Sequence, residues 1–296
     1  MPKTVYRPVS SLKTVNYAGS VLVLRRPVIY RKLRKHIGRT IQPLLRSLRR
    51  LLGCIAPNYA PTKMIGPFGP FKFDSIFVFS DFRSWGEDHN CGFQRLIQEA
   101  RSARCVFDVG AHVGITALPL SAASINGLVV AFEPGQRNYQ LLERHRKLNG
   151  IKNLRCENLI VGDENLSGGV RFYQADEASG MNSVIPSKKM VAYVENIPMI
   201  TLDSYAKRNT FSPDLIKIDV EGFELQVLKG ASFLLREYRP VVMISIHPIH
   251  LAHQGLTPND VKAELTKHRY AWFYPDDTPV GSANLLLSEY LVRFSP

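Results

Sequence analysis

The sequence lacks the cysteine pattern of a metal cluster or a disulfide framework, and it lacks long apolar runs. Its 296 residues include four widely separated cysteines and no C-x-x-C pair, which argues against a zinc cluster and against a fold held together by disulfides. No apolar run approaches the ~18–20 residues that cross a bilayer, and no segment has the pattern of a secretory signal. We therefore expect reduced thiols and a cytoplasmic location.

Acidic side chains are missing from the chain before Asp74. Residues 1–60 hold 13 of the 38 lysines and arginines, which leaves 25 basic and 25 acidic side chains in the remainder. The net charge of +13 therefore belongs to the N-terminal segment. We predict a basic arm with an amphipathic helix over 1–60, a linker with a lead-in strand and helix over 61–103, and the main domain over 104–296.

The basic arm contains a helical pattern. Between Ile37 and Ile55 apolar residues recur at three- and four-residue steps, with Arg46, Arg49 and Arg50 on or beside the opposite face. Such a helix could lie on an anionic membrane, where each basic residue contributes about 1 kcal/mol. It could instead pack on the main domain, or the arm could be an organellar transit peptide. A peripheral membrane location and an organellar one thus remain alternatives.

Strand and helix patterns alternate from Arg104 onward. Strands are predicted at 104–109, 128–133, 153–161, 214–220 and 240–247, and helices at 114–124, 136–148, 221–237 and 258–268. Outside this series we predict a strand at 71–80, a helix at 93–104, strand-like runs at 170–174 and 197–201, and a terminal hairpin of 270–274 with 285–294. The pattern indicates the α/β class, with a mostly parallel, doubly wound sheet that ends in an antiparallel hairpin strand. Ligands of such sheets bind at the carboxyl ends of the strands.

The first strand of this series runs into the glycine turn VFDVGAHVGIT, residues 106–116. The middle glycine of the dinucleotide motif G-x-G-x-x-G is missing, which disfavours a dehydrogenase. Asp108 before Gly110 and Gly114 instead suits S-adenosylmethionine, whose amino acid end a carboxylate can organise. Glu133 ends the next strand 19 residues after Gly114 and could accept hydrogen bonds from both ribose hydroxyls. His112 could stack near the cofactor or merely fill the loop.

A second cluster of chemically active residues follows the strand that begins at Asp214. Asp219 and Glu221 stand at its carboxyl end, and the Asp/Asn-Pro-Pro-Tyr motif of enzymes that methylate nucleic acid bases is missing there. Lys217 is predicted to form an ion pair or to lie at the rim of the sheet. His247 ends the next strand and is a candidate general base, because its ordinary pKa is about 6.5. A metal site that includes the nearby histidines His250 and His253 is an alternative.

Together these segments resemble the FkbM-type family of S-adenosylmethionine-dependent methyltransferases over roughly residues 84–275. The resemblance lies in FDVGAHVGIT (107–116), VAFEP (130–134), Asn149-Gly150, VGDE (161–164), SGMNSV (179–184), TLDSY (201–205), DLIKIDVEGFELQVLKGA (214–231) and PVVMISIHP (240–248). It implies a Rossmann-like class I methyltransferase fold. It also implies O-methylation of a hydroxyl on a sugar, a glycan or glycolipid, or a polyketide-like small molecule.

The resemblance also implies roles for individual residues. The cofactor would be bound by the two motifs that carry Asp108, Gly110, His112, Gly114, Thr116, Glu133 and Pro134, with Asn158 near the adenine. The methyl-transfer site would be lined by Asp219, Glu221 and His247, and covered by Asn182 and Ser183. The chain departs from many relatives at Ser245, where they carry a glutamate two residues before the histidine. Whether the site binds a divalent metal is left open.

Two other functions stay open at this point. One is a nucleic acid methyltransferase that uses the basic arm as a phosphate clamp. The other is a non-catalytic, methyltransferase-like binding protein docked on a membrane. The retained pair of Asp108 and Glu133 argues against the second, because a degenerate domain has little reason to keep both.

Overall fold

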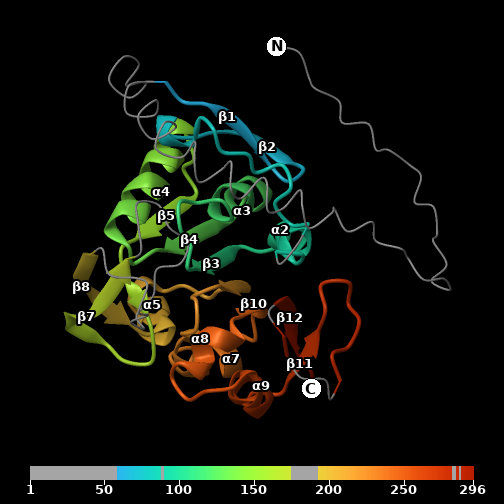
Figure 1. Ribbon diagram of the computed structural model, residues 1–296. Coiled ribbons are helices and arrows are strands. Elements are labelled where there is room, and N and C mark those ends of the chain that lie inside the picture. The colour runs from blue at the N-terminus through green and yellow to red at the C-terminus, as the bar shows by residue number, and fades with distance from the viewer. Residues whose placement is uncertain (1–58, 88–89, 175–192, 282–284, 287) are drawn as a thin grey trace, which may run out of the picture. The chain divides into compact units, whose positions relative to one another are not determined.

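A computed structural model describes residues 59–87, 90–174, 193–281, 285–286 and 288–296, all of which lie within one compact unit, Arg49–Pro296 (Figure 1). The predicted basic helix and the two predicted substrate residues, Asn182 and Ser183, lie outside these residues. Within them, no helix has the length and apolar character needed to cross a membrane.

A seven-stranded sheet forms the centre of the unit. Its strands lie in the order β11 (Tyr270–Phe273), β12 (Ser288–Phe294), β10 (Val241–Ile246), β9 (Leu215–Ile218), β3 (Cys105–Val109), β4 (Leu128–Phe132) and β5 (Leu154–Glu157). β12 runs antiparallel to both neighbours, whereas the other strands run parallel to one another. The predicted α/β class, the doubly wound Rossmann-like sheet and its antiparallel C-terminal hairpin strand are confirmed.

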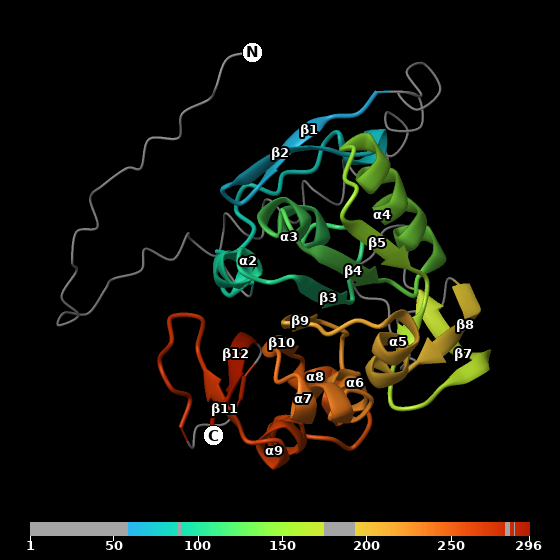
Figure 2. The ribbon, with the colours of Figure 1, turned by 180° about the vertical axis from the view of Figure 1, so that it is seen from behind.

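Helices cover both faces of this sheet, as the two opposite views show (Figures 1 and 2). One face is covered by α2 (Phe93–Ala100), α3 (Ala117–Ala123) and α4 (Gln136–Leu148), and the other by α5 (Leu202–Asn209), α6 (Glu224–Lys229), α7 (Ser232–Glu237), α8 (Pro248–Ala252) and α9 (Pro258–Lys267). Along β3, Val106 packs against the layer of α2, α3 and α4, whereas Phe107 and Val109 pack against the layer of α5 to α9. Because side chains alternate between the faces of a strand, a strand covered on both sides is apolar throughout.

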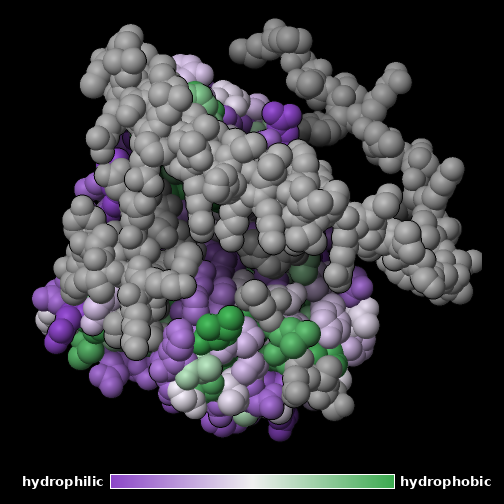
Figure 3. Space-filling model, viewed as in Figure 1, coloured by the Kyte–Doolittle hydropathy of each residue, from purple (hydrophilic) through white to green (hydrophobic). Residues whose placement is uncertain are grey.

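The described surface on one face of the unit is mostly polar. On the face seen in Figure 3, hydrophilic side chains dominate the described surface and apolar ones form small separate groups. Large apolar residues that remain exposed include Ile249 and Leu286, at 70% and 69% exposure. Buried apolar residues are concentrated in the two layers against the seven-stranded sheet, with a smaller cluster in the three-stranded sheet.

The lead-in to the sheet differs from the sequence prediction. The predicted strand over 71–80 is wrong: β1 (Thr62–Ile65) and β2 (Phe68–Lys72) form an antiparallel hairpin, and the short 3-10 helix η1 (Ser75–Phe77) follows. The Asp74 side chain accepts a hydrogen bond from the Ile76 amide at 2.9 Å, which ends the extended stretch. The hairpin lies at the start of the segment 61–103, which was predicted as a linker with a lead-in strand and helix. Its proline and glycine residues are typical of linkers, but such turn residues also connect short strands.

Several elements are shorter than predicted. The predicted strand over 153–161 divides into β5 and β6 (Ile160–Val161), and β6 joins β7 (Leu166–Gln174) and β8 (Tyr193–Ile200) in a separate three-stranded sheet. The predicted helix over 221–237 is two helices, α6 and α7, which meet at Gly230 and Ala231. A Cβ at Gly230 would lie 1.9 Å from the Gly162 carbonyl oxygen, so backbone packing against the second sheet requires a glycine there. The helices α5 and α8 were not predicted.

Candidate active site

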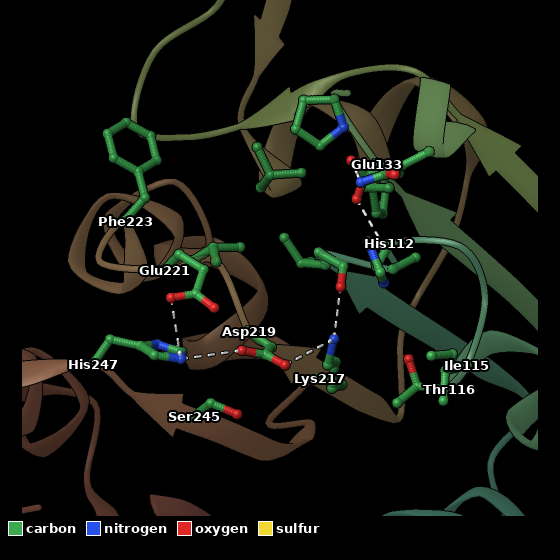
Figure 4. Close-up of a pocket in the computed structure, with 18 of the residues that line it drawn as sticks. His112, Ile115, Thr116, Glu133, Lys217, Asp219, Glu221, Phe223, Ser245 and His247 are labelled. Atoms are coloured by element: carbon green, nitrogen blue, oxygen red, sulfur yellow. Dashed lines mark hydrogen bonds and ion pairs between the residues drawn. The ribbon is translucent and has the colours of Figure 1, made fainter. Parts of the chain in front are cut away.

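A cavity opens at the carboxyl ends of β3, β4, β9 and β10. From β3 the strand order runs to β4 and β5 in one direction and to β9 and β10 in the other. The border between β3 and β9 is therefore the point where the strand order reverses. Such switch points are the usual ligand sites of doubly wound sheets. The cavity encloses about 290 Å³, near the lower end of the ~300–1,000 Å³ of ligand pockets. Its walls include Gly110, His112, Thr116, Glu133, Pro134, Lys217, Asp219, Glu221, Ser245 and His247 (Figure 4).

The glycine turn after β3 forms one wall. Gly110 has a φ of +81° and Gly114 one of +95°, a region that side chains disfavour. A Cβ at Gly110 would lie 1.9 Å from the Asp219 carbonyl oxygen. The turn therefore presses against the end of β9, and only glycine permits this approach.

Asp108 lies beneath the turn and is fully buried. One of its oxygens accepts a hydrogen bond from the Thr116 hydroxyl at 2.8 Å, and the other lies 3.1 Å from the Lys217 ammonium. Asp108 is not among the cavity-lining residues. Its carboxylate thus holds the loop in place, and the predicted contact with the amino acid end of the cofactor stays a prediction.

Lys217 connects the two predicted clusters, a role that the sequence alone did not identify. Its buried ammonium donates to the Gly110 carbonyl at 2.8 Å and lies 3.7 Å from an Asp219 oxygen. Burial by itself would lower the pKa of Lys217, but Asp108 and Asp219 outweigh this effect and raise it. The side chain is therefore a cation, and it holds the carboxylates of β3 and β9 together.

Glu133 faces the cavity from the end of β4 with 5% of its surface exposed. Its oxygens accept hydrogen bonds from the backbone amides of His112 at 2.8 Å and Gly135 at 2.9 Å. Burial raises the pKa of Glu133 to about 7, although these hydrogen bonds act in the opposite direction. Its position agrees with the predicted contact to ribose, which stays a prediction.

Asn158 and Pro134 occupy different positions around the same strand end. The Asn158 amide donates to the carbonyls of Glu133 at 3.0 Å and Pro134 at 2.7 Å. Pro134 lines the cavity and Asn158 does not. Asn158 therefore holds the backbone after β4 in place, and the predicted contact with adenine stays a prediction.

The opposite wall is formed by acids and a histidine. Asp219 and Glu221 follow β9, and His247 follows β10, so parallel strands bring residues 26 or more positions apart to one edge. The His247 Nε2 atom lies 3.5 Å from Asp219 Oδ1 and 3.7 Å from Glu221 Oε2 (Figure 4). On the other side of the ring, Nδ1 lies 2.7 Å from Oε1 of Glu224, which is fully buried in α6. The sequence analysis missed Glu224, whose signal was an acid three residues after Glu221.

These neighbours alter the titration of the cluster. Burial would lower the pKa of His247, but Glu224, Asp219 and Glu221 raise it to about 9. Burial raises the pKa of Glu221 to about 7. The His247 ring is consequently an imidazolium at neutral pH when the cavity contains no ligand, and it must lose that proton before it can act as the predicted base.

His250 also contacts this cluster, because its Nδ1 atom lies 2.9 Å from Glu221 Oε2, the oxygen that faces His247. The rings of His247, His250 and His253 are stacked in series, with centroids 5.8 and 6.2 Å apart and planes 15° and 19° from parallel. Among the residues described, the group that could hold a metal is Asp219, Glu221 and His247, whose donor atoms all lie within 4.8 Å of one another. The geometry therefore favours a mixed carboxylate and imidazole site over a three-histidine site.

Comparison with known proteins agrees with this architecture. A family model described as the methyltransferase FkbM domain matches residues 108–271. The chain belongs to the FkbM methyltransferase family. The match begins at the buried Asp108 and ends in β11, so it includes every predicted cofactor and catalytic residue.

Individual relatives match part of the chain. The hexuronic acid methyltransferase AglP of Haloferax volcanii is 29% identical over 175 residues, 58% of this chain and 65% of that protein. The methyltransferase sdnD of Sordaria araneosa is 27% identical over 158 residues, 42% of this chain and 59% of that protein. The matches thus span less than two thirds of the relatives' length. A crystal structure of an FkbM methyltransferase from Methylobacillus flagellatus aligns with 64% of this chain and 43% of that one, at 20% identity and a TM-score of 0.41.

This FkbM domain contains a buried carboxylate beside Ser245. On the neighbouring strand β12, Glu289 is the direct cross-strand partner of Ser245. Glu289 is 5% exposed, accepts a hydrogen bond from the Gly92 amide at 2.6 Å, and has a pKa that burial raises to about 7. Directly paired side chains lie on the same face of a sheet. A carboxylate is therefore supplied next to position 245 by a residue 44 positions later, where no local sequence signal could reveal it.

Proposed function

We propose that the chain is an S-adenosylmethionine-dependent methyltransferase that methylates a hydroxyl oxygen of a small molecule or glycan. The observation that carries this proposal is that one cavity is lined both by the glycine turn with Glu133 and by Asp219, Glu221 and His247. A methyl donor and an acceptor held by these two walls would meet at the strand ends between them.

The residues present suit the cofactor. The turn is compact enough that any side chain at Gly110 would collide with the backbone of Asp219. Glu133 is fixed by two backbone amides and faces the cavity, which suits a carboxylate that accepts hydrogen bonds from ribose hydroxyls. The cofactor would supply an electrophilic methyl group on its sulfonium, and the chain would bind and orient it.

The acid and histidine wall would hold the acceptor. Correct orientation of two reactants can contribute about 7–11 kcal/mol to lowering the barrier, and Asp219, Glu221 and His247 could orient a hydroxyl by hydrogen bonds. As the hydroxyl oxygen bonds to the methyl carbon, the sulfur–carbon bond of the cofactor would break and S-adenosylhomocysteine would leave. The hydroxyl proton would pass to a carboxylate or to neutral His247 of this cluster. Their position at adjacent strand ends, directly across the cavity from Glu133, supports this assignment (Figure 4).

A sugar hydroxyl is the acceptor class that we favour, in a free glycan or a glycolipid. The support is the similarity to a protein named as a hexuronic acid methyltransferase, at 29% identity. A polyketide-like alcohol is the alternative acceptor. Nucleic acid is disfavoured because Asp219-Val220-Glu221-Gly222 stands where base methyltransferases carry Asp/Asn-Pro-Pro-Tyr.

Calorimetry with S-adenosylhomocysteine tests the cofactor, and transfer of a radiolabelled methyl group to pooled cell glycans and lipids tests the reaction. We expect one binding site, loss of binding in Glu133→Ala, and loss of transfer with retained binding in Asp219→Asn. Glu164→Gln is the matched control, because that acid is exposed away from the cavity. Lack of binding by the folded wild-type chain would refute the proposal.

A further inference from the structure

We propose that Asp219, Glu221 and His247 bind a divalent metal ion in the cavity. Each offers one donor atom, and the three donors lie within 4.8 Å of one another. The set is mixed, with two carboxylate oxygens from the loop after β9 and one imidazole nitrogen from the end of β10. This metal site rests on the proposed function for its role in the reaction, but metal binding itself does not depend on methyl transfer.

The distances from His247 Nε2 to the two carboxylates are longer than direct hydrogen bonds and favour an ion between them, while Glu221 Oε2 also lies 2.9 Å from His250 Nδ1. His247 Nε2 lies 3.5 Å from Asp219 Oδ1 and 3.7 Å from Glu221 Oε2. Hydrogen bonds between nitrogen and oxygen are usually about 2.7–3.2 Å long. Two ligands that are each about 2.1 Å from one ion are roughly 3.0–3.6 Å apart, depending on the angle between them. The spacing across this gap is therefore near that of ligands around a shared ion.

A carboxylate outside the donor set orients the histidine. Glu224 is fully buried, and its Oε1 lies 2.7 Å from His247 Nδ1 and 3.0 Å from the Gly222 amide. Histidines that bind metals commonly donate their second N–H to such a carboxylate, which fixes the ring and its tautomer. Here the contact leaves Nε2 directed at Asp219 and Glu221, and a bound ion would take the place of the Nε2 proton.

The charges around the site also suit a divalent cation. Two carboxylates balance a charge of +2. Lys217 lies 3.7 Å from Asp219 Oδ2, the oxygen that does not face His247, and it also pairs with Asp108. Asp219 Oδ1 is consequently left to face the gap between the three donors.

The donor types narrow the choice of ion. Carboxylate oxygens suit Mg²⁺ and Mn²⁺, whereas imidazole suits Zn²⁺, Fe²⁺ and other transition metals. Mn²⁺ is compatible with both and gives a direct spectroscopic signal, so it is the probe of choice. In the proposed reaction, the ion would bind the acceptor hydroxyl and favour its deprotonation.

The test is a titration of the chelator-treated full chain with Mn²⁺, with free Mn²⁺ measured by electron paramagnetic resonance and no cofactor or acceptor present. We expect one equivalent to bind to the wild-type chain. Asp219→Asn and Glu221→Gln should each weaken binding by about tenfold or more, and Glu224→Gln by about tenfold through the orientation of His247. His253→Gln is the matched control, since it removes an exposed histidine next to the cluster and should leave binding unchanged.

Two outcomes would overturn the metal site: no Mn²⁺ binding by the wild-type chain, or binding that the Asp219 and Glu221 variants retain in full. Affinity for S-adenosylhomocysteine shows that each variant is folded. Mn²⁺ binding without S-adenosylhomocysteine binding would refute the proposed function and leave the metal site standing. S-adenosylhomocysteine binding without Mn²⁺ binding would refute the metal site alone.

Discussion

The Cα of Gly110 faces the carbonyl oxygen of Asp219 so closely that an added Cβ would lie 1.9 Å from that oxygen. This approach joins the two halves of the candidate site, because Gly110 belongs to the predicted cofactor turn and Asp219 to the predicted methyl-transfer cluster. Lys217 spans the same junction through the Gly110 carbonyl. Changes to the Gly110 backbone or loss of Lys217 should therefore affect both halves together.

Gly110→Ala should destabilise the fold and abolish binding of S-adenosylhomocysteine. The backbone φ of +81° and the collision with Asp219 both oppose a side chain, so we expect a loss of more than about 2 kcal/mol in unfolding free energy. Gly150→Ala is the control, with a φ of +61° but no atom within 4 Å of the added Cβ. It should lose only about 1 kcal/mol. Urea denaturation measures both, and equal losses would contradict the steric explanation.

Binding of S-adenosylhomocysteine should weaken in acid because of Glu133. Burial raises the pKa of Glu133 from 4.5 to about 7, and the protonated carboxyl is a poorer acceptor for ribose hydroxyls. If only the carboxylate binds, the dissociation constant should rise about tenfold between pH 8 and pH 6. Calorimetry at several pH values measures this change. Glu133→Gln should bind weakly without this pH dependence, and a wild-type affinity independent of pH would count against the ribose assignment.

The raised pKa of Glu133 also predicts how the unfolding free energy changes with pH. A pKa that is higher in the folded state than in the unfolded state favours folding while the group is protonated. This contribution of Glu133 should be complete below pH 4.5 and disappear as the pH rises through about 7. Between these pH values, Glu133→Gln should lose less unfolding free energy with rising pH than the wild type does.

Lys217→Met should strongly destabilise the chain. It would leave Asp108, which has no exposed surface, without the ammonium 3.1 Å away. Loss of one partner from a buried ion pair costs about 3–5 kcal/mol. The double variant Asp108→Asn with Lys217→Met should recover part of this loss, because the unpaired charge is removed. Urea denaturation of the single and double variants checks the coupling, and a double variant no more stable than the single one would argue against it.

The basic arm should bind anionic membranes. Replacement of Arg46, Arg49 and Arg50 by glutamine should weaken binding of the full chain to phosphatidylserine vesicles by about 3 kcal/mol, at about 1 kcal/mol per arginine. Vesicle sedimentation at low and high salt measures this, with neutral vesicles as the control. Tighter salt-sensitive binding to RNA than to these vesicles would instead favour the nucleic acid alternative.

Much of the fold could be predicted because the signals were local. The strand before Gly110, the helix after Gly135 and the strand that ends at Ile246 were each indicated by apolar pattern and turn residues within their own segment. The prediction of a single helix over 221–237 was wrong, because the periodicity of the segment and its packing in the fold favour different structures. Gly230 ends α6 and is itself a local stop signal, which the apolar helical pattern over 221–237 outweighed in the prediction. The close approach of the Gly162 carbonyl, which requires a glycine at position 230, depends on tertiary packing.

The sequence by itself determined the family, the α/β sheet and the types of residue at its carboxyl edge, because motif spacing and side-chain periodicity are local properties of the chain. Tertiary structure alone decided which of those residues meet. It set Lys217 between Asp108 and Asp219, Glu224 behind His247 and Glu289 beside Ser245. Such contacts depend on strand order and on helix packing, which bring together residues far apart in the chain.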